Sequence, residues 1–319
     1  MSTAKRQQRV GTDLMPLLLD TDIGSNIDDA LCLAYLLRQR RCELLGITTV
    51  GCEPTVRAQL ASAICRAFGR GEVPIHSGSA VPLIVDQRQS DVPQKTVLAN
   101  WPHHEKFKPN SAIDFLREMI HAWPGQITLL SIGPLTNIGL LFAVDPEIPR
   151  LLRQYVLMGG VYLGPVPHYG LTERNTCGDP HATSIVFRAN VPKMRCVGLD
   201  VTTQCRMPAD ACRARLHSGA LKIIGDMAEV WFRDHSEVVF HDPLAAAVIF
   251  ESDLCTFQPC LVQINLEGGR EQGLMCLNTQ SGQTPHQVAV IVEPKAFFEH
   301  YFATAEEHPT GEQSDYGAS

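Results

Sequence analysis

Short apolar runs alternate with helix-like segments from residue 16 to residue 199, and this alternation constrains the fold more than any other feature. Strands that alternate with helices predict an α/β fold, built as an open, mostly parallel, Rossmann-like sheet with helices on both faces. The predicted strands cover residues 16–22, 44–50, 126–132, 155–158 and 194–199, and the predicted helices cover residues 27–40, 55–68, 111–122 and 134–143. Such sheets bind ligands at the carboxyl ends of their strands.

The 319 residues are enough for one large domain. No internal repeat or linker divides the chain, so we expect a single domain over residues 1–303, with residues 1–15 flexible. The polar segment after residue 303 predicts a disordered tail over residues 304–319. Residues 79–110 are polar, proline-rich and aperiodic, which is typical either of a loop over a site or of a surface excursion.

Composition excludes several classes of protein. Hydrophobic residues make up 45% of the chain and charged residues 19%, which is too apolar for a disordered protein. The net charge is −7 without a basic run, so we expect no nucleic-acid partner. No stretch of about 18 apolar residues predicts a membrane span, and the amino terminus does not resemble a signal peptide. The 11 cysteines include no CxxC pair, which favours reduced thiols and a cytoplasmic location.

Four carboxylates crowd into ten residues between an apolar strand and an apolar helix, at Asp20, Asp22, Asp28 and Asp29. Capping by Asn26 and a favourable helix dipole would explain one or two of the acids. They do not explain four that converge beside buried segments, because an unpaired buried carboxylate costs several kcal/mol or takes up a proton. A divalent cation would remove that cost, and hard oxygen ligands favour Ca²⁺ or Mg²⁺ over Zn²⁺.

A strand that ends in D-x-D also begins the haloacid-dehalogenase-type phosphatases, which use the first Asp as a nucleophile and bind Mg²⁺. Here the second acidic pair follows too soon, on a helix, and neither the distant lysine nor the later acidic pair of that class is evident. A Mg²⁺-dependent phosphatase therefore remains as a minor alternative.

Three later segments each predict a helix start. SIGPLTN (131–137) places Pro134 after a strand, and Asp precedes Pro in GDPHA (178–182) and in HDPLAAA (241–247). Proline suits the first helical position because its missing N–H would be unpaired there, and Asp is a good N-cap. Any one of these segments could be an ordinary helix start.

Taken together and in order, these motifs resemble the inosine-uridine-preferring nucleoside hydrolase family. The resemblance spans residues 17–250 and rests on DTDIGSNIDDA (20–30), GITTVG (46–51), SIGPLTN, VLMGG (156–160), ERN followed by DP (173–180), GLDVT (198–202) and HDPLA. It implies the nucleoside hydrolase fold and an N-glycosyl hydrolase that cleaves purine or pyrimidine ribonucleosides into base and ribose.

The resemblance also implies a Ca²⁺ site. The matching positions make Asp22, Asp29 and Asp242 carboxylate ligands and make Ile132 a ligand through its backbone carbonyl. Asp22 would also activate the attacking water as a catalytic residue. Asp20 is expected to support this loop from behind.

The substrate residues implied by the resemblance come from the same motifs. Asp28, Glu173 and Asn175 would hold the ribose hydroxyls. His241 would lie beside the nucleobase and act as a catalytic acid for the departing base, since histidine can titrate near neutrality. By resemblance alone, the enzyme is expected to be a homo-oligomer, either a dimer or a tetramer.

The chain departs from the family pattern at several positions. Asn26 stands where relatives with the longer opening motif carry Asp, Glu53 lies in a Cys-Glu-Pro segment that replaces the usual Gly-Asn, and Pro167 replaces an Asn used for the 5′-hydroxyl. His168 and Tyr169 are nearby substitutes. The resemblance therefore implies the family's metal and diol binding for this chain, but it does not imply the family's recognition of the base and the 5′ end. A non-catalytic riboside-binding protein on the same scaffold remains an alternative.

Overall fold

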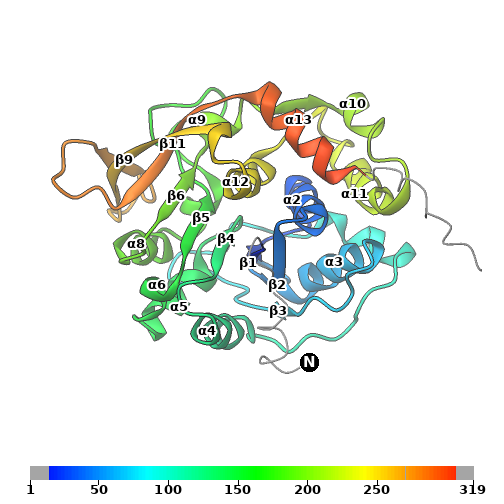
Figure 1. Ribbon diagram of the computed structural model, residues 1–319, viewed down its shortest axis with the longest axis horizontal. Coiled ribbons are helices and arrows are strands. Elements are labelled where there is room, and N and C mark those ends of the chain that lie inside the picture. Colours follow the sequence, from blue (N-terminus) through cyan, green and yellow to red (C-terminus); the bar gives the residue numbers. More distant parts are fainter. Residues whose placement is uncertain (1–13, 270, 307–319) are drawn as a thin grey trace, which may run out of the picture.

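A nine-stranded sheet crosses the molecule, with helices on both of its faces (Figure 1). The computed structural model describes residues 14–269 and 271–306. The strand order is β10-β9-β11-β6-β5-β4-β1-β2-β3, parallel from β3 through β11 and antiparallel at β9 and β10. The strands of this sheet are β1 Met15–Thr21, β2 Cys42–Thr49, β3 Ile75–Ser77, β4 Thr128–Ser131, β5 Gln154–Met158, β6 Met194–Val197, β9 Cys255–Ile264, β10 Met275–Asn278 and β11 His286–Val292. The predicted α/β class with a mostly parallel sheet is confirmed.

Two apolar cores lie on the two faces of the sheet. One core packs under α2 Asp28–Arg38, α3 Pro54–Ala67, α11 Lys222–Trp231, α12 His241–Phe250 and α13 Pro294–Ala305, and the other under α4 Ala112–Ala122, α5 Thr136–Val144, α6 Ile148–Leu151 and α8 Pro180–Arg188. Leu17 and Leu19 enter the first core and Leu18 enters the second, because successive side chains of a strand point to opposite faces. This is why β1 reads as a continuous apolar run.

The crevice that positions the site lies beside β1. The chain runs from β1 outward through β2 to β3, then returns to the other side of β1 with β4 and continues outward through β5 and β6. The strand order therefore reverses between β1 and β4. Open α/β sheets bind ligands at such a reversal, outside the carboxyl ends of the strands.

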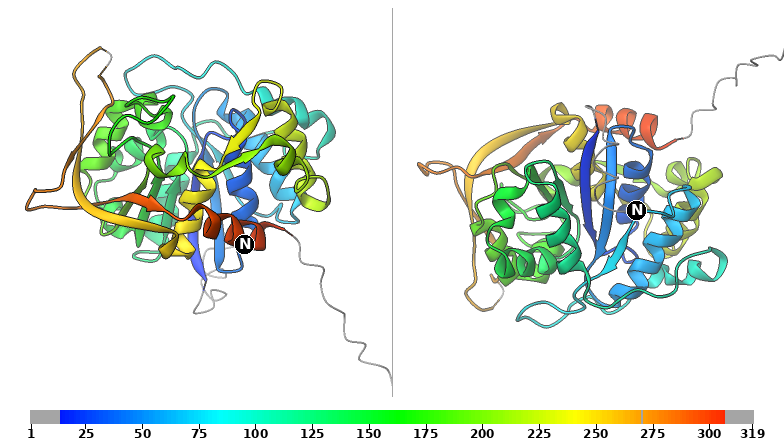
Figure 2. Two further views of the ribbon diagram at one scale, coloured as in Figure 1. Left: turned by 90° about the horizontal axis from the view of Figure 1, so that it is seen from above. Right: turned by 60° about the horizontal axis from the view of Figure 1, so that its bottom comes forward.

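Shorter elements and an edge hairpin complete the fold. They are η1 Pro93–Asn100, α7 Arg174–Gly178, α9 Leu199–Thr202, β7 Arg206–Pro208, α10 Ala209–Arg213, η2 Gly219–Leu221, β8 Glu237–Val239 and η3 Ser252–Leu254. Strands β7 and β8 form a separate two-stranded sheet, and the hairpin of β9 and β10 projects from the body of the molecule (Figure 2). Among the described residues, no helix is both long and apolar enough to cross a membrane.

The structure corrects several local predictions. Helix α2 starts at Asp28 with Ile27 as its N-cap and no side-chain cap, so Asn26 is not the cap. Helix α5 starts at Thr136, two residues beyond Pro134. Asp179 does cap α8, by accepting from the Ala182 N–H at 3.0 Å.

The ordered elements extend slightly into the segments predicted to be flexible or disordered, residues 1–15 and 304–319. Met15 belongs to β1, and α13 continues to Ala305 because Phe302 and Ala305 are buried against the core. The rest of the predicted flexible segment and tail, residues 1–13 and 307–319, lies outside the described residues.

Candidate active site

Two helix N-termini meet at the carboxyl end of β1. The strand ends at Thr21, the chain turns through Gly24, and α2 begins with Asp28 and Asp29. Helix α12, which lies more than 200 residues later in the sequence, carries Asp242 in its first turn. Asp242 therefore lies inside the helix and is not its N-cap. Backbone N–H groups and the helix dipoles favour negative charge at both places.

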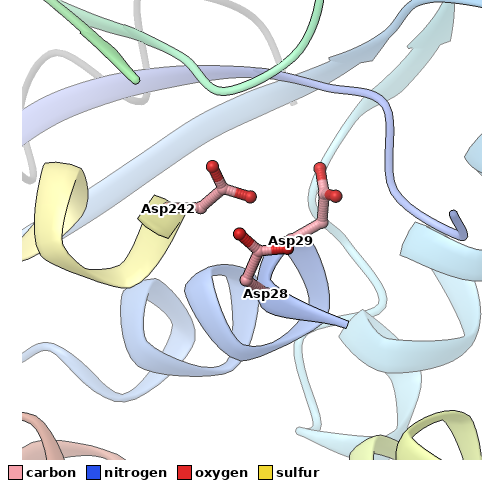
Figure 3. Close-up of side chains that lie close together, drawn as sticks. All are labelled: Asp28, Asp29 and Asp242. Atoms are coloured by element: carbon pink, nitrogen blue, oxygen red, sulfur yellow. The ribbon is translucent and has the colours of Figure 1, made fainter. Parts of the chain in front are cut away.

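Asp28, Asp29 and Asp242 form a buried group of three carboxylates (Figure 3). One oxygen from each lies within 4.8 Å of the others. Burial, reinforced by the repulsion of neighbouring carboxylates, raises the pKa of Asp28 to about 7 and raises the pKa values of Asp29 and Asp242 well above the usual range. The donor set consists of hard carboxylate oxygens, which favour a hard divalent cation.

Asp22 lines the same cavity but does not belong to that group of three. Its Oδ2 accepts a hydrogen bond from the Gln89 amide, which comes from the aperiodic segment. The structure thus groups Asp28, expected as a ribose ligand, with the expected metal ligands Asp29 and Asp242, and sets Asp22 beside them. Burial raises the pKa of Asp22, and the nearby charges of Arg57 and Arg174 oppose that rise.

Asn175 and Glu173 reach the cavity from the start of α7. The Asn175 amide donates to the backbone carbonyls of Ile132, at 2.9 Å, and Met158, at 3.1 Å, so the Ile132 carbonyl, expected as a metal ligand, accepts from Asn175 in this structure. The Glu173 carboxylate accepts from the backbone N–H groups of Gly160, Asn175 and Thr176. These bonds fix both side chains and leave the Asn175 amide oxygen to accept from a ligand hydroxyl.

His241 stands at the first position of α12, next to Asp242. Its Nδ1 lies 2.7 Å from the Thr202 hydroxyl, and its ring meets Tyr169 edge to face, with 6.2 Å between centroids. Burial, together with the charge of Arg206, lowers the pKa of His241 to about 3. The expectation that this histidine titrates near neutrality is therefore wrong for the protein without substrate, where the imidazole is neutral.

Asp20 sits behind the site, as expected for a supporting residue. It is fully buried in β1, and its Oδ1 accepts from the Thr48 hydroxyl at 2.5 Å and from the Asn137 amide at 2.7 Å. Burial raises its pKa to about 7. Asp20 therefore ties β1 to β2 and α5 directly beneath the acidic turn.

The carboxylates open into a cavity of about 470 Å³, large enough for a small ligand. Sequence reasoning missed part of its lining: Gln89, Arg174, Trp231, His235 and Glu237. Trp231 and His235 stack with ring centroids 3.5 Å apart at one side. Tyr169, named as a substitute near the 5′ end, lines the cavity, whereas His168 and Pro167 are exposed and are not part of its lining. The missed residues carry no periodic pattern, and only the aromatic pair four residues apart could have drawn attention.

Comparison with known proteins agrees with this geometry. The model of the family described as inosine-uridine preferring nucleoside hydrolase matches residues 17–299. The chain is 31% identical over 297 residues to the non-specific ribonucleoside hydrolase RihC of Escherichia coli K12, covering 89% of this chain and 95% of that protein. It is 28% identical over 312 residues to uridine nucleosidase 1 of Arabidopsis thaliana, covering 89% and 91%.

Solved structures are similar over the same range. The purine-preferring ribonucleoside hydrolase from Gardnerella vaginalis superposes with a TM-score of 0.79 at 26% identity, covering 91% of this chain and 98% of that one. An inosine-guanosine nucleoside hydrolase superposes with a TM-score of 0.80 at 19% identity, covering 92% and 99%, which shows the shared fold. These matches speak against the phosphatase alternative for the opening motif. The chain belongs to the inosine-uridine preferring nucleoside hydrolase family.

Proposed function

We propose that this protein is a Ca²⁺-dependent hydrolase that cleaves the N-glycosidic bond of ribonucleosides to give free base and ribose. The observation that carries the proposal is the group of Asp28, Asp29 and Asp242, buried at two helix N-termini beside a cavity of about 470 Å³. Membership of a family whose curated relatives are named as ribonucleoside hydrolases supports the reaction type.

The carboxylates that line the cavity suit this reaction. Cleavage passes through a ribose with oxocarbenium character. The carboxylates that line the cavity, where this ribose would bind, are those of Asp22, Asp28, Asp29, Glu173 and Asp242. Preorganised negative groups stabilise developing positive charge best where water is excluded. A bound divalent cation would supply a water of lowered pKa and a hold on the vicinal diol.

The chain's own groups take the remaining tasks. Asp22 is the proposed base for the attacking water because it borders the acidic group without being part of it. Asn175, through its amide oxygen, and Glu173 hold ribose hydroxyls. His241, as a neutral imidazole, would donate a hydrogen bond from Nε2–H to the departing base and would not transfer that proton, because the Thr202 hydroxyl can donate to Nδ1. The base would then take its proton from water.

The choice of Ca²⁺, held by Asp22, Asp29, Asp242 and the Ile132 carbonyl, is part of the proposal. The structure suggests Asp28 as a further ligand. We also propose a cytoplasmic location and a homo-oligomeric state. Light scattering, which measures the molar mass in solution, would test the oligomeric state.

A reducing-sugar assay over a panel of purine and pyrimidine ribonucleosides tests the function directly. We expect ribose release that stops with a chelator and returns with CaCl₂, and that is lost in Asp242→Asn. Tight binding of nucleosides without ribose release would instead support the non-catalytic riboside-binding alternative. Phosphate release from phosphorylated substrates, with no ribose from any nucleoside, would overturn both.

A further inference from the structure

Residues 79–100, called the strap here, lie across the acidic turn between β1 and α2. The Gln94 N–H donates to the Gly24 carbonyl at 3.2 Å, and the Gln94 amide donates to the Asn26 carbonyl at 3.0 Å. Gly24 has a φ of +112°, and a Cβ there would lie 2.5 Å from the buried Val92 side chain. The aperiodic segment is therefore packed against the site and is not a surface excursion.

Within the strap, Gln89 reaches the proposed base. Its amide nitrogen donates to Asp22 Oδ2, while Asp22 Oδ1 lies on the side of Gly133, where a Cβ would be 3.0 Å from it. The two oxygens of Asp22 thus lie on different sides, Oδ2 toward Gln89 and Oδ1 toward Gly133. Room for the Gln89 amide comes from Gly51, where a Cβ would lie 2.2 Å from Gln89 Oε1.

Arg57 fixes which end of that amide faces Asp22. The Gln89 Oε1 accepts from Arg57 Nη2 at 3.2 Å. A guanidinium group has only donors, so the amide oxygen must face Arg57 and the NH₂ group must face Asp22. Arg57 is itself fully buried and held in place by further acceptors, which are the carbonyls of Asp22, Ile23 and Cys52 and the hydroxyl of Ser25.

We propose that Gln89 and Arg57 are positioning residues for Asp22, with Arg57 orienting the Gln89 amide and the amide holding one carboxylate oxygen so that the other is presented to the cation and the attacking water. This inference rests on the proposed function. It assigns a task to the strap, and it explains how Asp22 keeps one orientation although it stands outside the group of three carboxylates.

Gln89→Ala and Gln89→Glu together test this role. Loss of a group that orients a metal ligand typically costs about 10–100-fold in metal affinity or activity. We expect Gln89→Ala to lower kcat by that factor with KM changed less than about twofold, and to weaken Ca²⁺ binding measured by calorimetry. Gln89→Glu keeps the size of the side chain and its contact with Arg57, but it turns a carboxylate toward Asp22. It should therefore be at least as impaired as Gln89→Ala, although a purely packing role would tolerate it.

Gln59→Ala is the matched control. The Gln59 amide, from α3, donates to the backbone carbonyl of Glu105 at 2.9 Å. Glu105 belongs to the aperiodic segment 79–110, and neither residue lines the cavity. This variant therefore loses a similar hydrogen bond without affecting Asp22. We expect its kcat and Ca²⁺ affinity to match those of the wild type. The proposal is overturned if both Gln89 variants keep Ca²⁺ affinity and kcat within about twofold of the wild type. If the wild type releases no ribose, the proposed function fails, and calorimetry still decides the role of Gln89.

Discussion

The raised pKa values of the site carboxylates predict that Ca²⁺ stabilises this protein more at about pH 8 than at about pH 6. Burial raises the pKa of Asp28 to about 7, and it also raises the pKa values of Asp29 and Asp242 well above the usual range of a carboxyl group. At the lower pH these groups hold protons that a cation must displace, and at the higher pH some of these protons have already left.

The size of the effect follows from Asp28 alone. Between about pH 6 and pH 8, a carboxyl group with a pKa of about 7 passes from about nine-tenths protonated to about nine-tenths ionised. The apparent Ca²⁺ affinity should therefore rise about tenfold, which adds about 1.4 kcal/mol of stabilisation at a fixed saturating concentration. For a chain of this length that corresponds to a further rise in Tm of about 2 °C.

The protein without metal should show the opposite trend. A raised pKa means that the folded state takes up protons, so the stability this uptake contributes is present at acid pH and is lost as pH rises through about 7 for Asp20 and Asp28. The Tm in chelator should therefore fall from about pH 6 to about pH 8 while the gap to the Ca²⁺-loaded protein widens.

Differential scanning calorimetry in chelator and in millimolar CaCl₂, at both pH values, measures this gap. Asp242→Asn should abolish the Ca²⁺-induced rise in Tm, and Asp253→Asn, a change at an exposed acid in η3, should leave it intact. A rise that is equal at the two pH values, or larger at the lower one, would refute the argument from buried, proton-binding carboxylates.

Three further variants test separate parts of the structure. Asp29→Asn should raise the Tm of the metal-free protein at about pH 8, because it removes like-charge repulsion while keeping an acceptor for Thr21, and calorimetry should show that it weakens Ca²⁺ binding. His241→Ala should cut kcat by about 10²–10³-fold on nucleosides, because it removes a hydrogen bond to the negative charge that develops on the departing base, but far less on p-nitrophenyl riboside, whose leaving group is a stable anion; equal losses on both substrates would reject the donor role. Asp145→Asn should cost about 1 kcal/mol in urea unfolding at neutral pH, since Arg117 and His121 hold the pKa of Asp145 at about 2 but are themselves half exposed, and this cost should shrink as pH falls from about 4 toward 2.

Much of the fold and of the site was predictable because it is encoded locally. The apolar run of β1 is buried on both faces, so its composition alone indicates a central strand. The acids at Asp22, Asp28 and Asp29 follow it directly, and the sheet then places them at a strand's carboxyl end. The edge hairpin of β9 and β10 gave a weaker sequence signal. Its exposed and buried positions alternate irregularly, and β9 contains Pro259, a residue type that is unusual inside a strand.

The rest of the site depends on contacts between distant segments. Gln89 lies in a polar stretch without periodicity, and nothing in its neighbours indicates that it reaches Asp22. The pKa of His241 reflects burial among elements far apart in the chain, so the residue type alone suggested a titration near neutrality that the fold removes. Likewise, the pairing of Asp28 with Asp242 joins α2 to α12, which no local pattern specifies.

The arrangement of charge explains why the positive groups of the protein itself do not fully compensate the buried carboxylates, so that a bound cation is expected. Two helix N-termini and the buried Arg57 already place positive charge near the carboxylates, and Arg57 lowers the pKa values of Asp22 and Asp29. Yet burial outweighs these contributions, and the carboxyl pKa values remain raised. The fold therefore holds the acids in place at a cost in stability, as expected of a site built for function. A divalent cation coordinated by these oxygens would repay that cost, so stability and metal binding should be coupled through the same carboxylates.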